Sequence, residues 1–160
     1  MIQDNTENKL YNGLNGESLI SPFKSERLLI EPKIKLGILA SGNGSNFEYI
    51  IKSIEKKQLN AELSILIVNN PSCLAINKAI KYGIPYVVIN HRNCNSRLEH
   101  DELVMMKLEE YSVELVVMAG WMRIAGDELI NRFKSRLINI HPSLLPSFKG
   151  VDAIQQAIDN

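Results

Sequence analysis

Five short, nearly continuous apolar runs recur along the chain, and a helical pattern follows each of them. The runs span residues 36–40, 63–68, 86–89, 115–119 and 137–140. Continuous apolar runs of this length are typical of strands that are covered on both faces, whereas half-exposed strands alternate. Strands that alternate with helices predict an α/β fold: a doubly wound, mainly parallel, Rossmann-like sheet with right-handed crossovers.

The helices are expected over residues 46–57, 72–82, 96–111 and 127–133, with another beginning near Val151. Ser96 followed by Glu99 three residues later is a capping-box pattern, which predicts the start of the third helix. The second helix has an apolar stripe, with Leu74, Ile76, Ala79 and Ile80 on one side. The third helix has a rougher stripe of Leu98, Leu103, Met106 and Leu108.

The 160 residues allow one domain with a substantial core. Residues 1–33 are polar and rich in Asn, Gly and Ser, which predicts a poorly ordered N-terminal extension before a domain at 34–160. The formal net charge is zero, so there is no electrostatic reason to expect a nucleic acid or an anionic membrane as partner. No secretion signal is visible, and Cys73 and Cys94 form no CxxC motif. These features favour a cytoplasmic protein and leave its oligomeric state open.

The loop after the first predicted strand is rich in glycine and reads Ser41-Gly42-Asn43-Gly44-Ser45-Asn46. Glycines let the backbone approach an anion, and a helix N-terminus supplies free N–H donors. A single phosphate fits better than a dinucleotide, because Phe47 replaces the third glycine of the dinucleotide fingerprint. In addition, Asn69 and Asn70 stand after the second strand, where an NAD site needs an acid. A plain turn with an ordinary helix cap is the alternative.

The loop after the fourth predicted strand, residues 119–125, contains Trp121, Met122 and Arg123. Ligands of parallel sheets bind beyond the carboxyl ends of the strands, and an apolar slot there suits a flat heterocyclic ligand. Taken alone, Trp121 and Met122 are more often core residues, and Arg123 is more often a surface ion-pair partner. Only their place at the ligand edge favours a binding role.

Asn139 and His141 follow the fifth predicted strand and lie two residues apart, so an extended backbone would place them on one face. Pro142 disfavours helix at His141 and keeps it extended. A carboxamide can stabilise an oxyanion, and an imidazole can exchange a proton near neutral pH. The pair therefore predicts acyl-type transfer.

A metal site is not expected. The candidate metal ligands are His91, Cys94 and His100, but their spacing fits no zinc motif and a fourth ligand is missing.

Three motifs together resemble phosphoribosylglycinamide formyltransferases, the enzymes of purine synthesis that use 10-formyltetrahydrofolate. They are the glycine loop at 42–46, the segment 119–124 and the segment 139–146, within a resemblance that covers about 35–160. Formyltetrahydrofolate deformylase and methionyl-tRNA formyltransferase share the asparagine–histidine segment. The glycine loop therefore distinguishes this family from its relatives.

The resemblance implies formyl transfer to the amine of glycinamide ribonucleotide, with formyl-folate as co-substrate, both substrates being small molecules, and with no metal. It implies phosphate binding by Gly44, Ser45 and Asn46. It implies folate binding by Arg97, Met122, Arg123, Ile124, Ala125 and Asn139, with Ala125 in place of the more usual leucine. Asn139 and His141 would be catalytic: they would stabilise the tetrahedral intermediate and bring a proton to N10 of the folate.

The family also has a later aspartate that orients the histidine, and further strands that complete the sheet. This sequence ends at Asn160, before either, so we expect a formyltransferase domain whose C-terminal strands are missing, with weak or absent turnover. Two alternatives stay open. One is a non-catalytic remnant that at most binds a phosphorylated small molecule. The other is a formyltetrahydrofolate hydrolase, whose water nucleophile needs no glycine loop.

Overall fold

A computed structural model describes residues 33–140 and 153–159. The predictions for residues 1–32 and for His141 lie outside the described residues and stay predictions.

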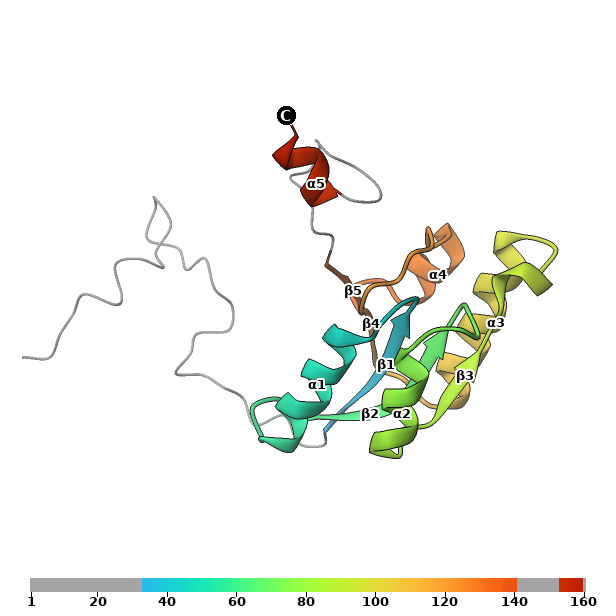
Figure 1. The fold of residues 1–160 in the computed structure, drawn as a ribbon. Helices are drawn as coiled ribbons and strands as arrows, with labels where there is room; N and C mark the ends of the chain where they lie inside the picture. Colours follow the sequence, from blue (N-terminus) through green and yellow to red (C-terminus); the bar gives the residue numbers. More distant parts are fainter. Residues whose placement is uncertain (1–32, 141–152, 160) are drawn as a thin grey trace, which may run out of the picture. The chain divides into compact units, whose positions relative to one another are not determined.

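The core of the molecule is a sheet of five parallel strands in the order β3-β2-β1-β4-β5 (Figure 1). The chain adds β2 and β3 on one side of β1 and then returns to add β4 and β5 on the other. The predicted doubly wound parallel sheet is thus confirmed, and its direction of winding reverses between β1 and β4. In such sheets the reversal opens a crevice at the carboxyl ends of the two central strands. The strands are Ile34–Ala40 (β1), Ala61–Val68 (β2), Tyr86–Val88 (β3), Leu115–Met118 (β4) and Leu137–Asn139 (β5).

Helices cover both faces of this sheet (Figure 1). One buried cluster joins α1 and α2 to the sheet through Phe47, Ile51, Ala75 and Ala79. The second cluster joins α3 and α4 to the opposite face through Val104, Leu108, Leu129 and Phe133. The helical elements are Ser45–Glu55 (α1), Ala75–Tyr82 (α2), His91–Asn93 (η3, a 3-10 turn), Arg97–Glu110 (α3), Asp127–Arg132 (α4) and Ala153–Ile158 (α5). Within the described ranges, no helix has the length and apolar character needed to cross a membrane.

Two predicted helix starts have different outcomes. Ser96 caps α3 as expected, because its hydroxyl accepts the Glu99 N–H at 3.1 Å. The second helix begins at Ala75 rather than at Ser72. Asn70 diverts the chain first: its side-chain oxygen accepts the Ser72 N–H at 2.9 Å, and this turn competes with helix.

The predicted stripes were correct only in part: Ala79 of α2 and Leu108 of α3 are buried, and Ile76 of α2 is partly buried. In α2 the small residues Ala75 and Ala79 face the sheet, while Leu74 and Ile80 are exposed. In α3 the predicted residues Leu98, Leu103 and Met106 are exposed, and the buried residues are His100, Asp101, Val104 and Leu108. Half of the buried face of α3 is therefore polar, which apolar periodicity cannot predict.

Candidate functional site

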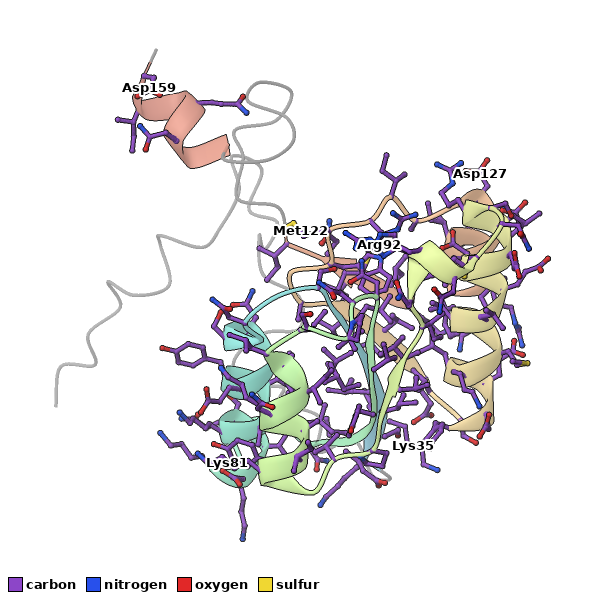
Figure 2. All side chains as sticks on the ribbon, turned by 45° about the vertical axis from the view of Figure 1, so that its right-hand side comes forward. Lys35, Lys81, Arg92, Met122, Asp127 and Asp159 are labelled. Carbon is purple, nitrogen blue, oxygen red and sulfur yellow. The ribbon has the colours of Figure 1, made fainter. Side chains whose placement is uncertain are left out.

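The two loop motifs and Asn139, the first residue of the third motif, lie at one edge of the sheet. Leu39 of β1 pairs with Met118 of β4, and Met118 pairs in turn with Asn139 of β5. The three strands thus end at the same level, and a motif lies at or directly after each end. Figure 2 shows Met122 at this end of the sheet and Lys35, from the start of β1, at the opposite end.

The glycine loop enters α1 through Gly44, which has a left-handed backbone with φ 66°. A Cβ at this position would lie 2.6 Å from the Cβ of Ala75, so only glycine allows the loop to approach α2 so closely. The Ala75 N–H donates to the Gly42 carbonyl at 3.2 Å and holds the loop from the other side. No side chain caps α1, and Ser45 and Asn46 are exposed in its first turn. The N–H groups of that turn are therefore available to an anion.

A cation from α2 lies beside this loop. The Lys78 ammonium donates to the Gly44 carbonyl at 3.2 Å and pairs with the Glu48 carboxylate at 2.7 Å. Glu48 also pairs with Lys52 at 3.1 Å. The hydrogen bonds from Lys78 and then Lys52 lower the pKa of Glu48 from its usual 4.5 to about 2. The loop is thus held by a charged side chain as well as by backbone contacts.

The 120–126 loop turns its residues alternately inward and outward. Trp121 is only 7% exposed, whereas Met122 and Ile124 are each 75% exposed. The general expectation that Trp121 and Met122 are core residues thus holds for Trp121 alone. Arg123 and Ala125 are half-buried. An exposed methionine and isoleucine at the ligand edge form an apolar surface that a flat heterocycle could cover.

Ser41 links the glycine loop to the 120–126 loop. Its N–H donates to the Gly120 carbonyl at 3.1 Å, and its hydroxyl accepts the Met122 N–H at 2.8 Å. The two loops follow the strands on either side of the sheet reversal. Together they form one hydrogen-bonded unit.

Arg97, which the resemblance assigned to the folate, lies exposed at the start of α3. A Cβ on Gly126 would lie 3.9 Å from the Arg97 Nε atom, so this guanidinium adjoins the end of the 120–126 loop. The Nε atom of Arg123 and the indole N–H of Trp121 are buried and have no hydrogen-bond partner among the residues that the structure describes. Arg97 thus lies beside the 120–126 loop, and the assignment of both to the folate stays a prediction.

Sequence reasoning missed the two buried polar residues behind this loop. Asp101 accepts the Gly126 N–H at 2.7 Å, and the His100 ring stacks on Trp121 with a centroid distance of 5.8 Å. One signal was available: His100 lies four and eight residues before Val104 and Leu108, which places it on the same helix face as these two apolar residues. Within the described residues no group of three or more His, Cys, Asp or Glu could hold a metal.

The two cysteines contact different segments of the chain, Cys73 at the Gly42 carbonyl and Cys94 at the Asn90 carbonyl. Burial raises the pKa of Cys73, whose thiol donates to the Gly42 carbonyl at 3.0 Å. Burial also raises the pKa of Cys94, and Glu99 adds to the effect while Arg123 opposes it. Both thiols are thereby made less nucleophilic.

Asn139 ends β5 with an exposed side chain at the level of Met118. His141, its predicted catalytic partner, lies outside the described residues. The structure therefore places one member of the predicted catalytic pair at the ligand edge.

Comparisons with known proteins agree with this arrangement. Residues 34–160 match the Formyl transferase family. The chain is 38% identical over 146 residues to the human trifunctional purine biosynthetic protein adenosine-3, covering 91% of this chain and 14% of that protein. It is 36% identical over 123 residues to phosphoribosylglycinamide formyltransferase of Bacillus subtilis, covering 77% of this chain and 63% of that enzyme.

A solved structure shares the fold. The phosphoribosylglycinamide formyltransferase from Bacillus halodurans superposes with a TM-score of 0.75 at 37% identity, covering 78% of this chain and 64% of that one. The chain spans less than two thirds of the length of these relatives. The family match extends over most of the chain and includes all three motifs, so this chain belongs to the formyl transferase family.

Proposed function

We propose that this chain transfers a formyl group from 10-formyltetrahydrofolate to the amine of glycinamide ribonucleotide, in cytoplasmic de novo purine synthesis. The proposal rests on two hydrogen bonds of Ser41, one to the Gly120 carbonyl and one from the Met122 N–H. They join a loop suited to a phosphate to a loop suited to a flat heterocycle, at the reversal point of one sheet. A transferase of this kind needs a phosphorylated acceptor and a pterin donor side by side.

The acceptor's phosphate binds at the first turn of α1, where Gly44 brings the backbone close and Ser45 and Asn46 add exposed side chains. The open N–H groups and the helix dipole favour an anion there. The nearby Lys78 ammonium adds positive charge, although Glu48 partly neutralises it. The helix terminus therefore makes the larger contribution.

The donor's pterin lies along Met122 to Ala125, with Arg97 near the end of the loop. An apolar surface with neighbouring backbone polar groups suits a pterin ring. Arg97 supplies a fixed positive charge suited to a carboxylate of the folate.

The reaction begins when the amine nitrogen attacks the formyl carbon. Asn139 stabilises the oxyanion of the tetrahedral adduct with its side-chain N–H, and His141 conducts the proton that the amine loses to N10 of the folate. The bond between the formyl carbon and N10 then breaks, so that the products are the formylated amide and tetrahydrofolate. No metal takes part in these steps.

The glycine loop favours this transferase over a formyl-folate hydrolase. A water nucleophile needs no phosphate site, yet Gly44 is fitted against Ala75 at a distance that excludes any side chain. The close fit supports a loop shaped for an anionic ligand.

Binding and turnover by the 160-residue chain test the proposal. We expect the natural chain to bind glycinamide ribonucleotide in calorimetry, and the Gly44→Ala variant to bind it at least about tenfold more weakly, because one well-placed anion contact contributes about 1.5–3 kcal/mol. Formylated product is measured by mass spectrometry with 10-formyltetrahydrofolate as donor. Release of formate without acceptor would favour the hydrolase, and binding without transfer would favour the remnant. Failure to bind glycinamide ribonucleotide would refute the proposal.

A further inference from the structure

The buried residues His100 and Asp101 connect the 120–126 loop to the rest of the domain. Asp101 is 1% exposed, and its Oδ2 atom accepts the Gly126 N–H at 2.7 Å. Gly126 is the residue at which the loop passes into α4. A Cβ at this position would lie 2.8 Å from the same carboxylate oxygen. The carboxylate therefore approaches the backbone too closely for any residue except glycine.

Two polar contacts hold the His100 ring in place. Its Nε2 atom lies 3.2 Å from the Ile89 carbonyl, and a carbonyl only accepts, so Nε2 carries a hydrogen. Its Nδ1 atom lies 3.4 Å from Oδ1 of Asp101. The buried ring and the buried carboxylate thus have polar partners, which reduces the cost of keeping them away from water.

The same pair contacts both ends of the loop. The His100 ring stacks on Trp121, near the start of the loop, with a centroid distance of 5.8 Å and an interplanar angle of 26°. Asp101 holds Gly126, at the end of the loop. Between these two points, Met122 and Ile124 are exposed. Fixing both ends limits the positions that the exposed segment can take.

Arg97 lies one helical turn before Asp101 on α3, so the two residues share a face of the helix. The first turns of α3 thus present an exposed guanidinium to the ligand edge and a buried carboxylate to the loop.

From these contacts we propose that Asp101, oriented by His100, is a positioning residue for folate binding. It holds the 120–126 loop so that Met122 to Ala125 present their apolar surface and backbone groups to the pterin. The identity of the ligand rests on the proposed function, whereas the positioning of the loop does not.

Three variants of the full chain test this proposal. Asp101→Ala removes the acceptor of the Gly126 N–H. Asp101→Asn retains it, because the amide oxygen can accept that N–H while the amide nitrogen donates to a neutral Nδ1 of His100. Glu102→Ala removes an exposed carboxylate from the adjacent position and is the matched control.

We expect Asp101→Ala to raise the Kd for tetrahydrofolate about tenfold, since a buried hydrogen bond to a charged group is lost. The Kd for glycinamide ribonucleotide should stay within about twofold, because the contacts of Gly44 do not involve Asp101. Trp121 is the only tryptophan of the chain, so its emission reports on the loop and should shift to the red in Asp101→Ala. Asp101→Asn and Glu102→Ala should resemble the natural chain in all three measurements.

Hydrogen exchange at the Gly126 amide provides a test on the natural chain itself. We expect this amide to exchange far more slowly than exposed loop amides, because it donates to a buried carboxylate. Rapid exchange would overturn the proposal even if Asp101→Ala failed to fold. Unchanged tetrahydrofolate affinity and Trp121 emission in a folded Asp101→Ala would also overturn it. If the natural chain binds no tetrahydrofolate, the assignment of the ligand is wrong. The Trp121 emission of Asp101→Ala and the exchange rate of the Gly126 amide then still decide whether Asp101 positions the loop.

Discussion

The hydroxyl of Ser41 accepts a hydrogen bond from the backbone N–H of Met122 at 2.8 Å. Ser41 follows β1 and Met122 follows β4, so this bond crosses the point at which the winding of the sheet reverses. Crevices at such points are the usual binding sites of open α/β sheets. The bond couples the start of the 120–126 loop to the glycine loop, whereas Asp101 holds the end of the 120–126 loop.

Removing this hydroxyl should therefore affect both substrates. Ser41→Ala leaves the Met122 N–H without its acceptor, a loss of about 1 kcal/mol or about fivefold in affinity. We expect KM to rise for the ribonucleotide and for the folate in steady-state kinetics. Ser72→Ala, which removes an exposed hydroxyl after β2, is the control. A rise in only one KM would contradict a shared bond.

Gly44 should tolerate no side chain, whereas Gly42 should. Gly44→Ala places a Cβ 2.6 Å from the Cβ of Ala75 on a backbone with φ 66°, whereas a Cβ at Gly42 has no atom within 4 Å. We expect Gly44→Ala to lower the free energy of unfolding by on the order of 1–3 kcal/mol. Gly42→Ala should change it by less than about 0.5 kcal/mol. Urea denaturation of the two variants measures the difference, and equal stabilities would disprove the close fit at Gly44.

The Glu48 ion pairs should make stability fall at low pH. The pKa of Glu48 is depressed from 4.5 to about 2 in the folded chain. The unfolded chain therefore binds the proton first, so the stabilisation is complete above pH 4.5 and is lost as the pH falls toward 2. We expect Glu48→Gln to flatten the decline in unfolding free energy across this window.

Denaturation at several pH values measures that decline. Glu55→Gln, at an exposed position two turns further along α1, should retain the natural slope and serves as the control. If the unfolding free energy of Glu48→Gln fell with pH as steeply as that of the natural chain, the contacts with Lys52 and Lys78 would not stabilise the fold.

Asn139 should act mainly on the chemical step. Asn139→Ala removes an oxyanion donor, which in comparable sites lowers kcat on the order of 100-fold. Single-turnover kinetics with 10-formyltetrahydrofolate measures the step directly. Asn131→Ala, an exposed asparagine on α4, is the control. An unchanged rate in Asn139→Ala would remove it from the catalytic residues.

The strands were predicted correctly in number and nearly in extent, because strands buried on both faces have continuous apolar sequences. The cap at Ser96 was also predicted, since it depends on residues three apart. The glycine loop could be identified because its geometry requires glycine at Gly44. Each of these features depends on neighbours in the sequence.

Of the buried face of α3, only Leu108 was predicted. His100 and Asp101 look like exposed residues, and their burial depends on Ile89, Trp121 and Gly126, which are distant in the sequence. A polar side chain becomes a core residue only when its partners satisfy it. In α2, similarly, the burial of Ala75 was not predicted, because it depends on the close approach of Gly44 from the glycine loop.

Sequence by itself determined the class of fold, the three loops to which we assign the chemistry, and the residue types placed there, since these follow from local backbone preferences and from apolar patterning. Only the tertiary structure decided the order of the strands, the bridge through Ser41, and the position of His100 and Asp101 behind the loop. The physical reason is that such contacts join residues separated by up to 81 positions. Their formation depends on how the helices pack against the sheet rather than on any local pattern.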